Sequence, residues 1–181
     1  MSAGRDAVRA AVERLASGRT RWIGIDGFGG AGKSTLAAWL ADTVADVVVV
    51  HADDFAAPSV PEWDWGRLQR QLVYPLRAGR PARYQRWAWH TDSAAEWHDV
   101  PVGAVVVIEG VSATRRELDV PWDVRVWVEA PPDIRLRRAL ARDGAAAERT
   151  WRERWIPEEL AWAQRDRPWE RADLVLDGTT S

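Results

Sequence analysis

Short apolar runs alternate with amphipathic stretches along the chain. The four valines at 47–50 are apolar on both faces, a pattern typical of a strand in a parallel sheet that is covered on both sides. Leu68 and Leu72 lie four residues apart, which predicts a helix over residues 64–74 that Pro75 is expected to end. The other expected strands lie at residues 22–26, 105–108, 125–128 and 174–176. The other expected helices lie at residues 3–16, 34–45, 133–142 and 148–165, the last interrupted at Pro157.

Strands that alternate with helices imply crossover connections and a parallel sheet. We therefore expect an α/β fold, a three-layer α/β/α sandwich around a mostly parallel five-stranded sheet. The length of 181 residues suits one domain, residues 1–181. Residues 79–103 show no clear period and are expected to be irregular. Ligands of such sheets bind outside the carboxyl ends of the strands.

A glycine-rich loop follows the first expected strand. Residues 27–34 read Gly-Phe-Gly-Gly-Ala-Gly-Lys-Ser, which matches the phosphate-loop pattern GxxxxGK[ST] between a predicted strand and a predicted helix. Glycines let backbone N–H groups face a phosphate without obstruction by Cβ atoms, and the helix N-terminus adds partial positive charge. Lys33 is expected to contact the β- and γ-phosphates, and the hydroxyl of Ser34 to bind Mg²⁺. The residues expected to bind the nucleotide are Gly27, Gly29, Gly30, Ala31, Gly32, Lys33, Ser34 and Thr35.

Lys33 is the only lysine in a chain that carries 25 basic residues, and the other 24 are arginines. If the loop were an ordinary glycine-rich turn, the single lysine would fall on the motif position by accident. A compact ammonium fits a phosphate cradle where a forked guanidinium does not. A GTPase motif Asn-Lys-x-Asp is excluded because no second lysine exists, and the Leu-Ser-Gly-Gly signature of transport ATPases is absent.

Composition excludes several other classes of protein. The chain has no cysteine and only three histidines, so thiol catalysis, disulfides and thiolate zinc sites are ruled out, and a histidine-built metal centre is disfavoured. A net charge of -2 gives no reason to expect nucleic acid or an anionic membrane as a partner. No apolar run approaches the roughly 18 residues that span a bilayer, and the N-terminus is charged. We expect a cytoplasmic protein with a small-molecule substrate, its oligomeric state left open.

Two acids follow the valine strand. Asp53 and Asp54 are expected at the carboxyl end of that strand, near the phosphate loop. An aspartate within hydrogen-bond reach of a hydroxyl can accept its proton during phosphoryl transfer. The pair would repel an acceptor that already carries phosphate, so it favours a neutral, hydroxyl-bearing acceptor. An acidic turn or a helix cap is the structural alternative.

Further charged candidates lie later in the chain. Glu109 ends the strand at 105–108 and is expected to hold Mg²⁺ together with Ser34, unless it only caps a helix. Asp26 and Glu129 are weaker candidates of the same kind. Arginines of a lid over residues 138–150 are expected to neutralise charge on the transferring phosphoryl group, unless they form an ordinary solvated face.

These motifs together resemble the uridine kinase and phosphoribulokinase family of P-loop kinases. The matching segments run in the family's order from residue 22 to residue 178: 25–36, 53–55, 63–64, 108–110, 138–143 and 172–178. The resemblance implies that Asp53 is the catalytic base and that Asp64 contacts substrate hydroxyls. It also implies that Arg138 and Arg142 are the lid arginines, with Arg142 catalytic and Arg138 near the substrate.

The segment at 56–101 is interpreted as an acceptor-side insertion. It is rich in tryptophan, and Tyr84 and Trp87, with Trp89, are expected to form an apolar wall of the acceptor pocket, unless they are ordinary core. The family's pyrimidine-pocket element, Tyr-Asp-Phe followed by histidine, is replaced here by Tyr-Gln-Arg at 84–86. This departure leaves pyrimidine specificity open.

The expected activity is that of an ATP- and Mg²⁺-dependent kinase that phosphorylates a hydroxyl of a small, nucleoside-like metabolite. Three alternatives stay open: a nucleotide monophosphate kinase, an antibiotic-type O-phosphotransferase, and a P-loop regulatory module that binds ATP and signals through a partner.

Overall fold

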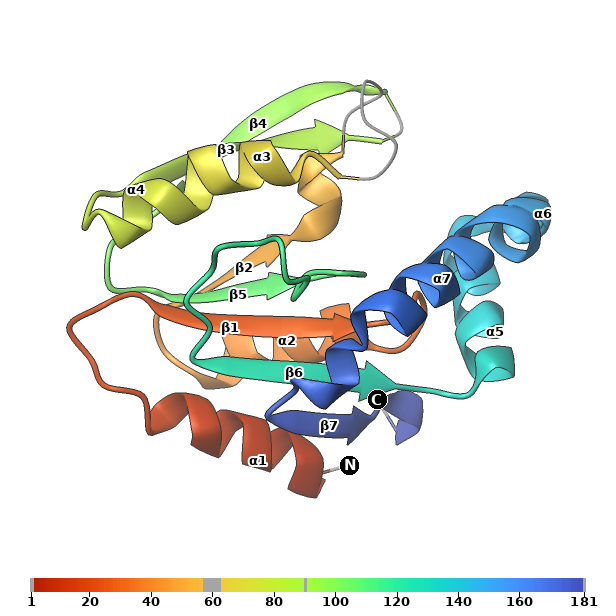
Figure 1. Cartoon of the computed structure of the whole chain (residues 1–181), viewed down its shortest axis with the longest axis horizontal. Coiled ribbons are helices and arrows are strands. Elements are labelled where there is room, and N and C mark those ends of the chain that lie inside the picture. Colours follow the sequence, from red (N-terminus) through yellow and green to blue (C-terminus); the bar gives the residue numbers. More distant parts are fainter. Residues whose placement is uncertain (1, 57–62, 90, 181) are drawn as a thin grey trace.

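A five-stranded parallel sheet forms the centre of the molecule (Figure 1). The computed structural model describes residues 2–56, 63–89 and 91–180. The strand order is β2-β5-β1-β6-β7, and every neighbouring pair is parallel. The strands are β1 (Arg21–Gly27), β2 (Val47–His51), β5 (Val105–Glu109), β6 (Val124–Glu129) and β7 (Leu174–Asp177). The expected α/β fold class is confirmed.

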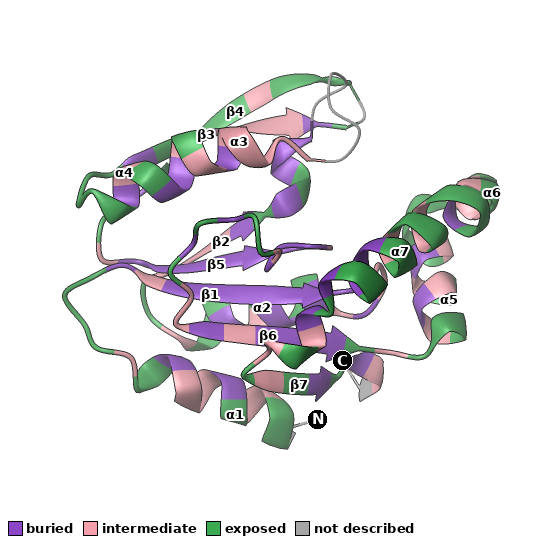
Figure 2. Cartoon of the chain, in the orientation of Figure 1, coloured by how far each residue is buried: buried purple, intermediate pink, exposed green. Residues whose placement is uncertain are grey.

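Helices cover one face of this sheet because the apolar runs of the strands need burial on both sides. Helix α1 (Ser2–Glu13) and helix α2 (Lys33–Thr43) pack their apolar side chains on this face. Val8, Val12 and Leu40 are fully or almost fully buried against the strands. In Figure 2 the central strands are mostly buried, whereas the outer faces of the helices are exposed.

Over β1, β2 and β5, the other face of the sheet is covered by a smaller unit together with residues 113–122. An antiparallel hairpin, β3 (Ala82–Ala88) with β4 (Ser93–Val100), packs with helices α3 (Trp65–Leu68) and α4 (Tyr74–Arg77). The expectation that residues 79–103 are irregular was wrong. The pairing of the two strands shifts between Gln85 and Trp87, and this irregularity breaks the two-residue alternation that would reveal a strand.

Pro75 does not end its helix as the sequence predicts, and the interruption expected at Pro157 is a local change of helix type. A π-helical turn over Gln69–Val73 precedes Pro75, and α4 continues to Arg77. A second π-turn over Trp151–Trp155 precedes Pro157, which lies in the first turn of α7 (Ile156–Asp166). Proline lacks an N–H group and clashes with the carbonyl four residues before it. The wider turn changes which carbonyl faces the ring, so the chain stays helical.

Helices α5 (Pro132–Asp143) and α6 (Glu148–Thr150) project beyond the carboxyl ends of the strands (Figure 1). The C-terminal part of α7 packs Trp162 and Ala163 against Trp127 of β6. Short 3-10 turns complete the chain at Ala52–Phe55, Ala145–Ala147, Pro168–Glu170 and Gly178–Thr180. Within the described ranges, none of the helices has the length and apolarity needed to cross a membrane.

Candidate active site

The phosphate loop connects β1 to α2 at the carboxyl edge of the sheet. Lys33 is 7% exposed, and its Nζ donates a hydrogen bond to the Phe28 carbonyl at 2.9 Å. Gly30 has a positive φ of 74°, and a Cβ there would lie 2.3 Å from the carbonyl oxygen of Arg135. Only glycine fits this position, so the loop is held tightly between β1 and helix α5.

A hydroxyl and a carboxylate meet beside the loop. Ser34 Oγ donates a hydrogen bond to Glu109 Oε1 at 3.0 Å, because Glu109 ends β5, the neighbour of β1 in the sheet. Burial alone would raise the pKa of Glu109, but the hydrogen bond from His51 and the charge of Lys33 hold that pKa below its ordinary value. An ionised carboxylate and a hydroxyl oxygen are ligands that suit Mg²⁺.

Sequence reasoning missed His51. Its Nδ1 lies 2.6 Å from Glu109 Oε1, and this contact raises the pKa of His51 above its ordinary value. The two residues are direct partners in the β2–β5 register. Only the strand order could have revealed this contact, since 58 residues separate the two in sequence.

Asp53 and Asp54 face different surroundings. Asp54 is 7% exposed and accepts a hydrogen bond from the hydroxyl of Tyr84 at 3.3 Å. Asp53 is exposed, and its Oδ1 accepts a hydrogen bond from Trp63 Nε1 at 3.0 Å. The indole N–H of Trp89 donates to the backbone carbonyl of Asp53 at 3.1 Å. The structure therefore leaves Asp53 open to a ligand and turns Asp54 toward the interior.

Three residues assigned to substrate binding lie on the hairpin side. Tyr84 is 2% exposed and stacks on both Phe55 and His98, which places it beneath the acids rather than at the surface. Trp87 is half-buried on β3. Asp64 caps helix α3, its Oδ1 accepting a hydrogen bond from the Arg67 N–H at 2.8 Å. Their contact with a substrate stays a prediction.

The two arginines on α5 that the resemblance assigns to a lid differ in their contacts. Arg138 donates hydrogen bonds to the carbonyls of Gly178 at 2.8 Å and Thr179 at 3.1 Å, which ties α5 to the C-terminal turn. Arg142 binds the carboxylate of Asp143 with two hydrogen bonds. That contact raises the pKa of Arg142, and the charge of Asp53 adds to the shift, so the guanidinium lies within the electrostatic reach of the proposed base.

A side chain of helix α7 forms a hydrogen bond with the phosphate loop, and no sequence pattern predicts this contact. Glu159 Oε2 accepts a hydrogen bond from the backbone N–H of Gly29 at 3.0 Å, across 130 residues. A Cβ on Gly29 would lie 2.6 Å from the Trp151 ring. Burial raises the pKa of Glu159 above its ordinary value. A carboxylate thus occupies one N–H donor of the loop expected to bind phosphate.

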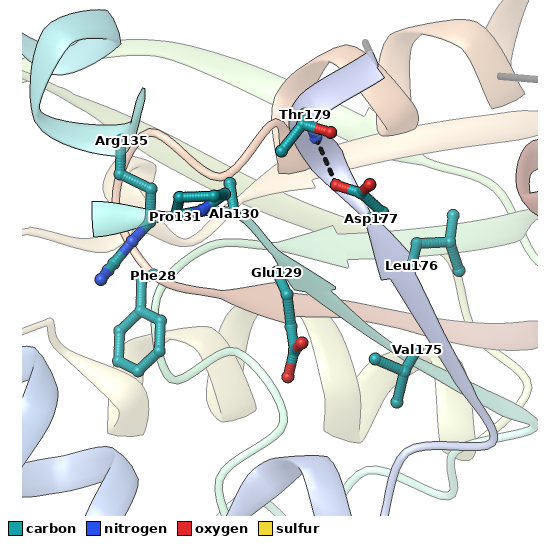
Figure 3. Close-up of a pocket in the computed structure, with 9 residues that line it drawn as sticks. All are labelled: Phe28, Glu129, Ala130, Pro131, Arg135, Val175, Leu176, Asp177 and Thr179. Atoms are coloured by element: carbon teal, nitrogen blue, oxygen red, sulfur yellow. Dashed lines mark hydrogen bonds between the residues drawn. The ribbon is translucent and has the colours of Figure 1, made fainter. Parts of the chain in front are cut away.

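A cavity of about 630 Å³ lies between Phe28 of the phosphate loop, the start of α5 and β7 (Figure 3). Its lining includes Phe28, Glu129 and Arg135. The guanidinium of Arg135 lies 4.3 Å from the centroid of the Phe28 ring, and burial lowers the pKa of Arg135. Glu129 accepts a hydrogen bond from Trp127 Nε1 at 3.1 Å, so the structure places it in this wall rather than beside Ser34.

Asp26 is buried and fully engaged in hydrogen bonds at the end of β1. Its carboxylate is 1% exposed and accepts hydrogen bonds from the backbone N–H groups of Gly27, Ser112 and Thr114 and from the Thr114 hydroxyl. Burial still raises the pKa of Asp26 above its ordinary value. These contacts fix the end of β1 to the turn after β5. Among the described residues, no group of three or more histidine or acidic side chains is placed to hold a metal ion.

Comparison with known proteins identifies relatives of this fold. No family model matches the chain. It is 29% identical over 99 residues to uridine-cytidine kinase A of Dictyostelium discoideum, and the match spans 54% of this chain but only 19% of that protein. A structure described as a possible uridine kinase from Bacillus stearothermophilus superposes with a TM-score of 0.74 at 22% identity, over 96% of this chain and 97% of the other.

A candidate fructose transport system kinase from Silicibacter sp. TM1040 superposes with a TM-score of 0.66 at 24% identity, over 95% of this chain and 98% of the other. The resemblance to uridine kinase-like and related P-loop kinases that the motifs predict is therefore confirmed, and the fold is shared over almost the whole chain.

Proposed function

We propose that this protein is a kinase that transfers the γ-phosphate of ATP to a hydroxyl of a small, nucleoside-like metabolite. The observation that carries the proposal is the continuous contact from Ser34 through Glu109 to His51, two residues before Asp53. It joins the phosphate loop to the strand that presents the proposed base. A nucleotide held by the loop and a hydroxyl beside Asp53 would then meet at the same edge of the sheet.

In this proposal, the phosphate loop and the lid bind the nucleotide. The backbone N–H groups of the phosphate loop and the ammonium of Lys33 would bind the triphosphate, because both carry positive charge. Arg142 would neutralise charge that develops on the transferring phosphoryl group. Residues 138–150 act as the lid in this proposal, with Arg138 near the substrate.

Ser34 and Glu109 would hold Mg²⁺, which supplies charge neutralisation between the β- and γ-phosphates when it is bound. The ionised state of Glu109 and the 3.0 Å separation of the two oxygen atoms fit this role. His51 orients the carboxylate of Glu109 through its short contact.

The acceptor side rests on Asp53 and the segment at 56–101. Asp53 would accept the proton of the acceptor hydroxyl while the hydroxyl oxygen attacks the γ-phosphorus. Trp87 and Asp64 would line the acceptor, as predicted from the sequence. The names of the relatives, which are uridine-cytidine, uridine and fructose transport system kinases, support a small hydroxyl-bearing substrate.

An ADP-release assay with nucleosides, sugars and vitamins as acceptors tests the proposal. We expect almost no turnover of MgATP alone and clear turnover with one class of neutral alcohol. Stimulation only by nucleoside monophosphates would favour a monophosphate kinase. Stimulation only by an antibiotic would favour an O-phosphotransferase of that kind. Slow hydrolysis that no acceptor changes would contradict a metabolite kinase and favour a regulatory module.

A further inference from the structure

Two indole N–H groups converge on one residue of the acceptor side. Trp63 donates to the Oδ1 atom of Asp53 at 3.0 Å, and Trp89 donates to the Asp53 backbone carbonyl at 3.1 Å. The two tryptophans come from different segments, one from the strand-like residue before α3 and one from the turn after β3. The indoles therefore hold Asp53 at its side chain and, together with the Ala56 N–H, at its main-chain carbonyl.

The position of Trp63 is itself fixed by the backbone. Ala56 and Trp63 pair as an isolated antiparallel bridge, and the N–H of Asp64 donates to the carbonyl of Phe55 at 2.6 Å. The Trp63 ring also lies 5.6 Å from the ring of Trp65. The indole N–H is therefore presented to the carboxylate by a paired backbone rather than by a free side chain.

Burial does not explain the position of Trp89, so its hydrogen bond to Asp53 calls for another reason. Trp89 is 60% exposed, although an indole in water is costly. Its indole N–H donates to the backbone carbonyl of Asp53. A residue placed only to fill the core would be covered, as Phe55 is at 0% exposure.

We infer that Trp63 and Trp89 are positioning residues that orient Asp53 as a general base, an inference that rests on the proposed function. An exposed aspartate rotates broadly about its terminal torsion. The Trp63 hydrogen bond holds Oδ1, and within the described part of the chain no hydrogen bond reaches Oδ2. Oδ2 is therefore the atom that accepts the proton of the acceptor.

Proton transfer to Oδ2 of Asp53 accompanies the transfer of the γ-phosphate. The O–H bond of the acceptor breaks and its proton moves to Oδ2, while the acceptor oxygen bonds to the γ-phosphorus of ATP. The bond from the γ-phosphorus to the bridging oxygen breaks, and ADP leaves with that electron pair. Orientation of the base matters because small displacements from the reactive geometry cost large factors in rate.

The chain offers a matched pair of substitutions to test this inference. Trp63→Phe removes the N–H donor and keeps an aromatic ring. Trp65→Phe makes the same change at the neighbouring indole, whose buried Nε1 has no hydrogen-bond partner among the described residues. With uridine, cytidine and fructose as acceptor probes, we expect Trp63→Phe to lower kcat roughly ten-fold, with KM for ATP and the thermal midpoint near those of Trp65→Phe. Trp65→Phe should keep the kcat of the parent protein.

A double-mutant cycle shows whether Trp63 acts through the carboxylate. Trp63→Phe should have no further effect on kcat when Asp53→Asn is already present. Equal kcat values for Trp63→Phe and Trp65→Phe would overturn the inference while leaving the kinase activity in place, and so would the same loss in the Asp53→Asn background. If Trp63→Phe fails to fold, Trp89→Phe replaces it, with the same expected outcome. If the parent protein releases no ADP with any nucleoside, sugar or vitamin in the ADP-release assay, the proposed function fails, and the inference fails with it.

Discussion

The hydroxyl of Tyr84 donates a hydrogen bond to Oδ2 of Asp54 at 3.3 Å, and both side chains are buried. Burial raises the pKa of Asp54, and burial together with the charge of Asp54 raises the pKa of Tyr84. The neighbouring Asp53 is exposed, and its carboxylate accepts a hydrogen bond from the indole of Trp63 instead. Two adjacent acids thus have different surroundings, which supports a structural role for Asp54 and the base role for Asp53.

Substitution of the two acids should separate these roles. Asp53→Asn should lower kcat by roughly 10²- to 10⁴-fold, the range for loss of a general base, with ATP affinity changed only a few-fold. Asp54→Asn keeps an oxygen that can accept the Tyr84 hydroxyl, so kcat should fall much less. Steady-state kinetics of both variants check this, and a larger loss for Asp54→Asn would exchange the two roles.

The same acid should make stability depend on pH. Because the pKa of Asp54 is higher in the folded protein than its ordinary value of about 3.9, the folded state holds this proton more tightly than the unfolded state. The contribution of Asp54 to stability therefore declines as pH rises from that ordinary value through the raised pKa.

Asp54→Asn should lack this decline. Urea unfolding of the parent protein and of the variant at about pH 4 and pH 7 measures the difference. The variant should gain stability relative to the parent at the higher pH. A relative loss on raising the pH would contradict the direction of the shift.

Much of the fold follows from local patterns, whereas the contacts within the site do not. Apolar runs such as Val105–Ile108 identify strands because a parallel sheet buries both faces. The hairpin is hidden because its pairing shifts between Gln85 and Trp87. The contact of His51 with Glu109 depends on β2 lying beside β5, and strand order is not encoded in any local pattern.

The proposed lid segment shows the same limit. Its arginines stand out in the sequence, but the contact of Arg138 with backbone carbonyls of the C-terminal turn depends on where β7 ends in the fold. Glu159 gave no signal because its partner is a backbone N–H group 130 residues away.

Removing the charge of Glu159 should strengthen nucleotide binding. Its carboxylate occupies the Gly29 N–H group and would repel a bound polyphosphate. Glu159→Gln should bind MgATP about five-fold more tightly, which corresponds to roughly 1 kcal/mol. Glu158→Gln is the matched control, since Glu158 is exposed and pairs with Arg154 at 3.3 Å. Calorimetric titration measures both, and equal affinities for the two variants would count against the repulsion.

Removing the carboxylate of Glu109, which lies beside Ser34, should raise the Mg²⁺ concentration that turnover requires. Glu109→Gln should raise the Mg²⁺ concentration needed for half-maximal turnover by roughly ten-fold, because an amide is a weaker ligand than a carboxylate. A Mg²⁺ titration of turnover at saturating ATP makes the measurement. An unchanged Mg²⁺ requirement would remove Glu109 from the proposed metal site.

The most direct test of the account follows the γ-phosphate itself. ATP labelled at the γ-phosphate is incubated with Mg²⁺, the acceptor found by the ADP-release assay, and either the parent protein or Lys33→Ala. The parent protein should move the label onto the acceptor hydroxyl, and Lys33→Ala should do so at least roughly 10²-fold more slowly while keeping its fold. Label that stays on ATP or appears only as free phosphate, or equal transfer by both proteins, would contradict the account.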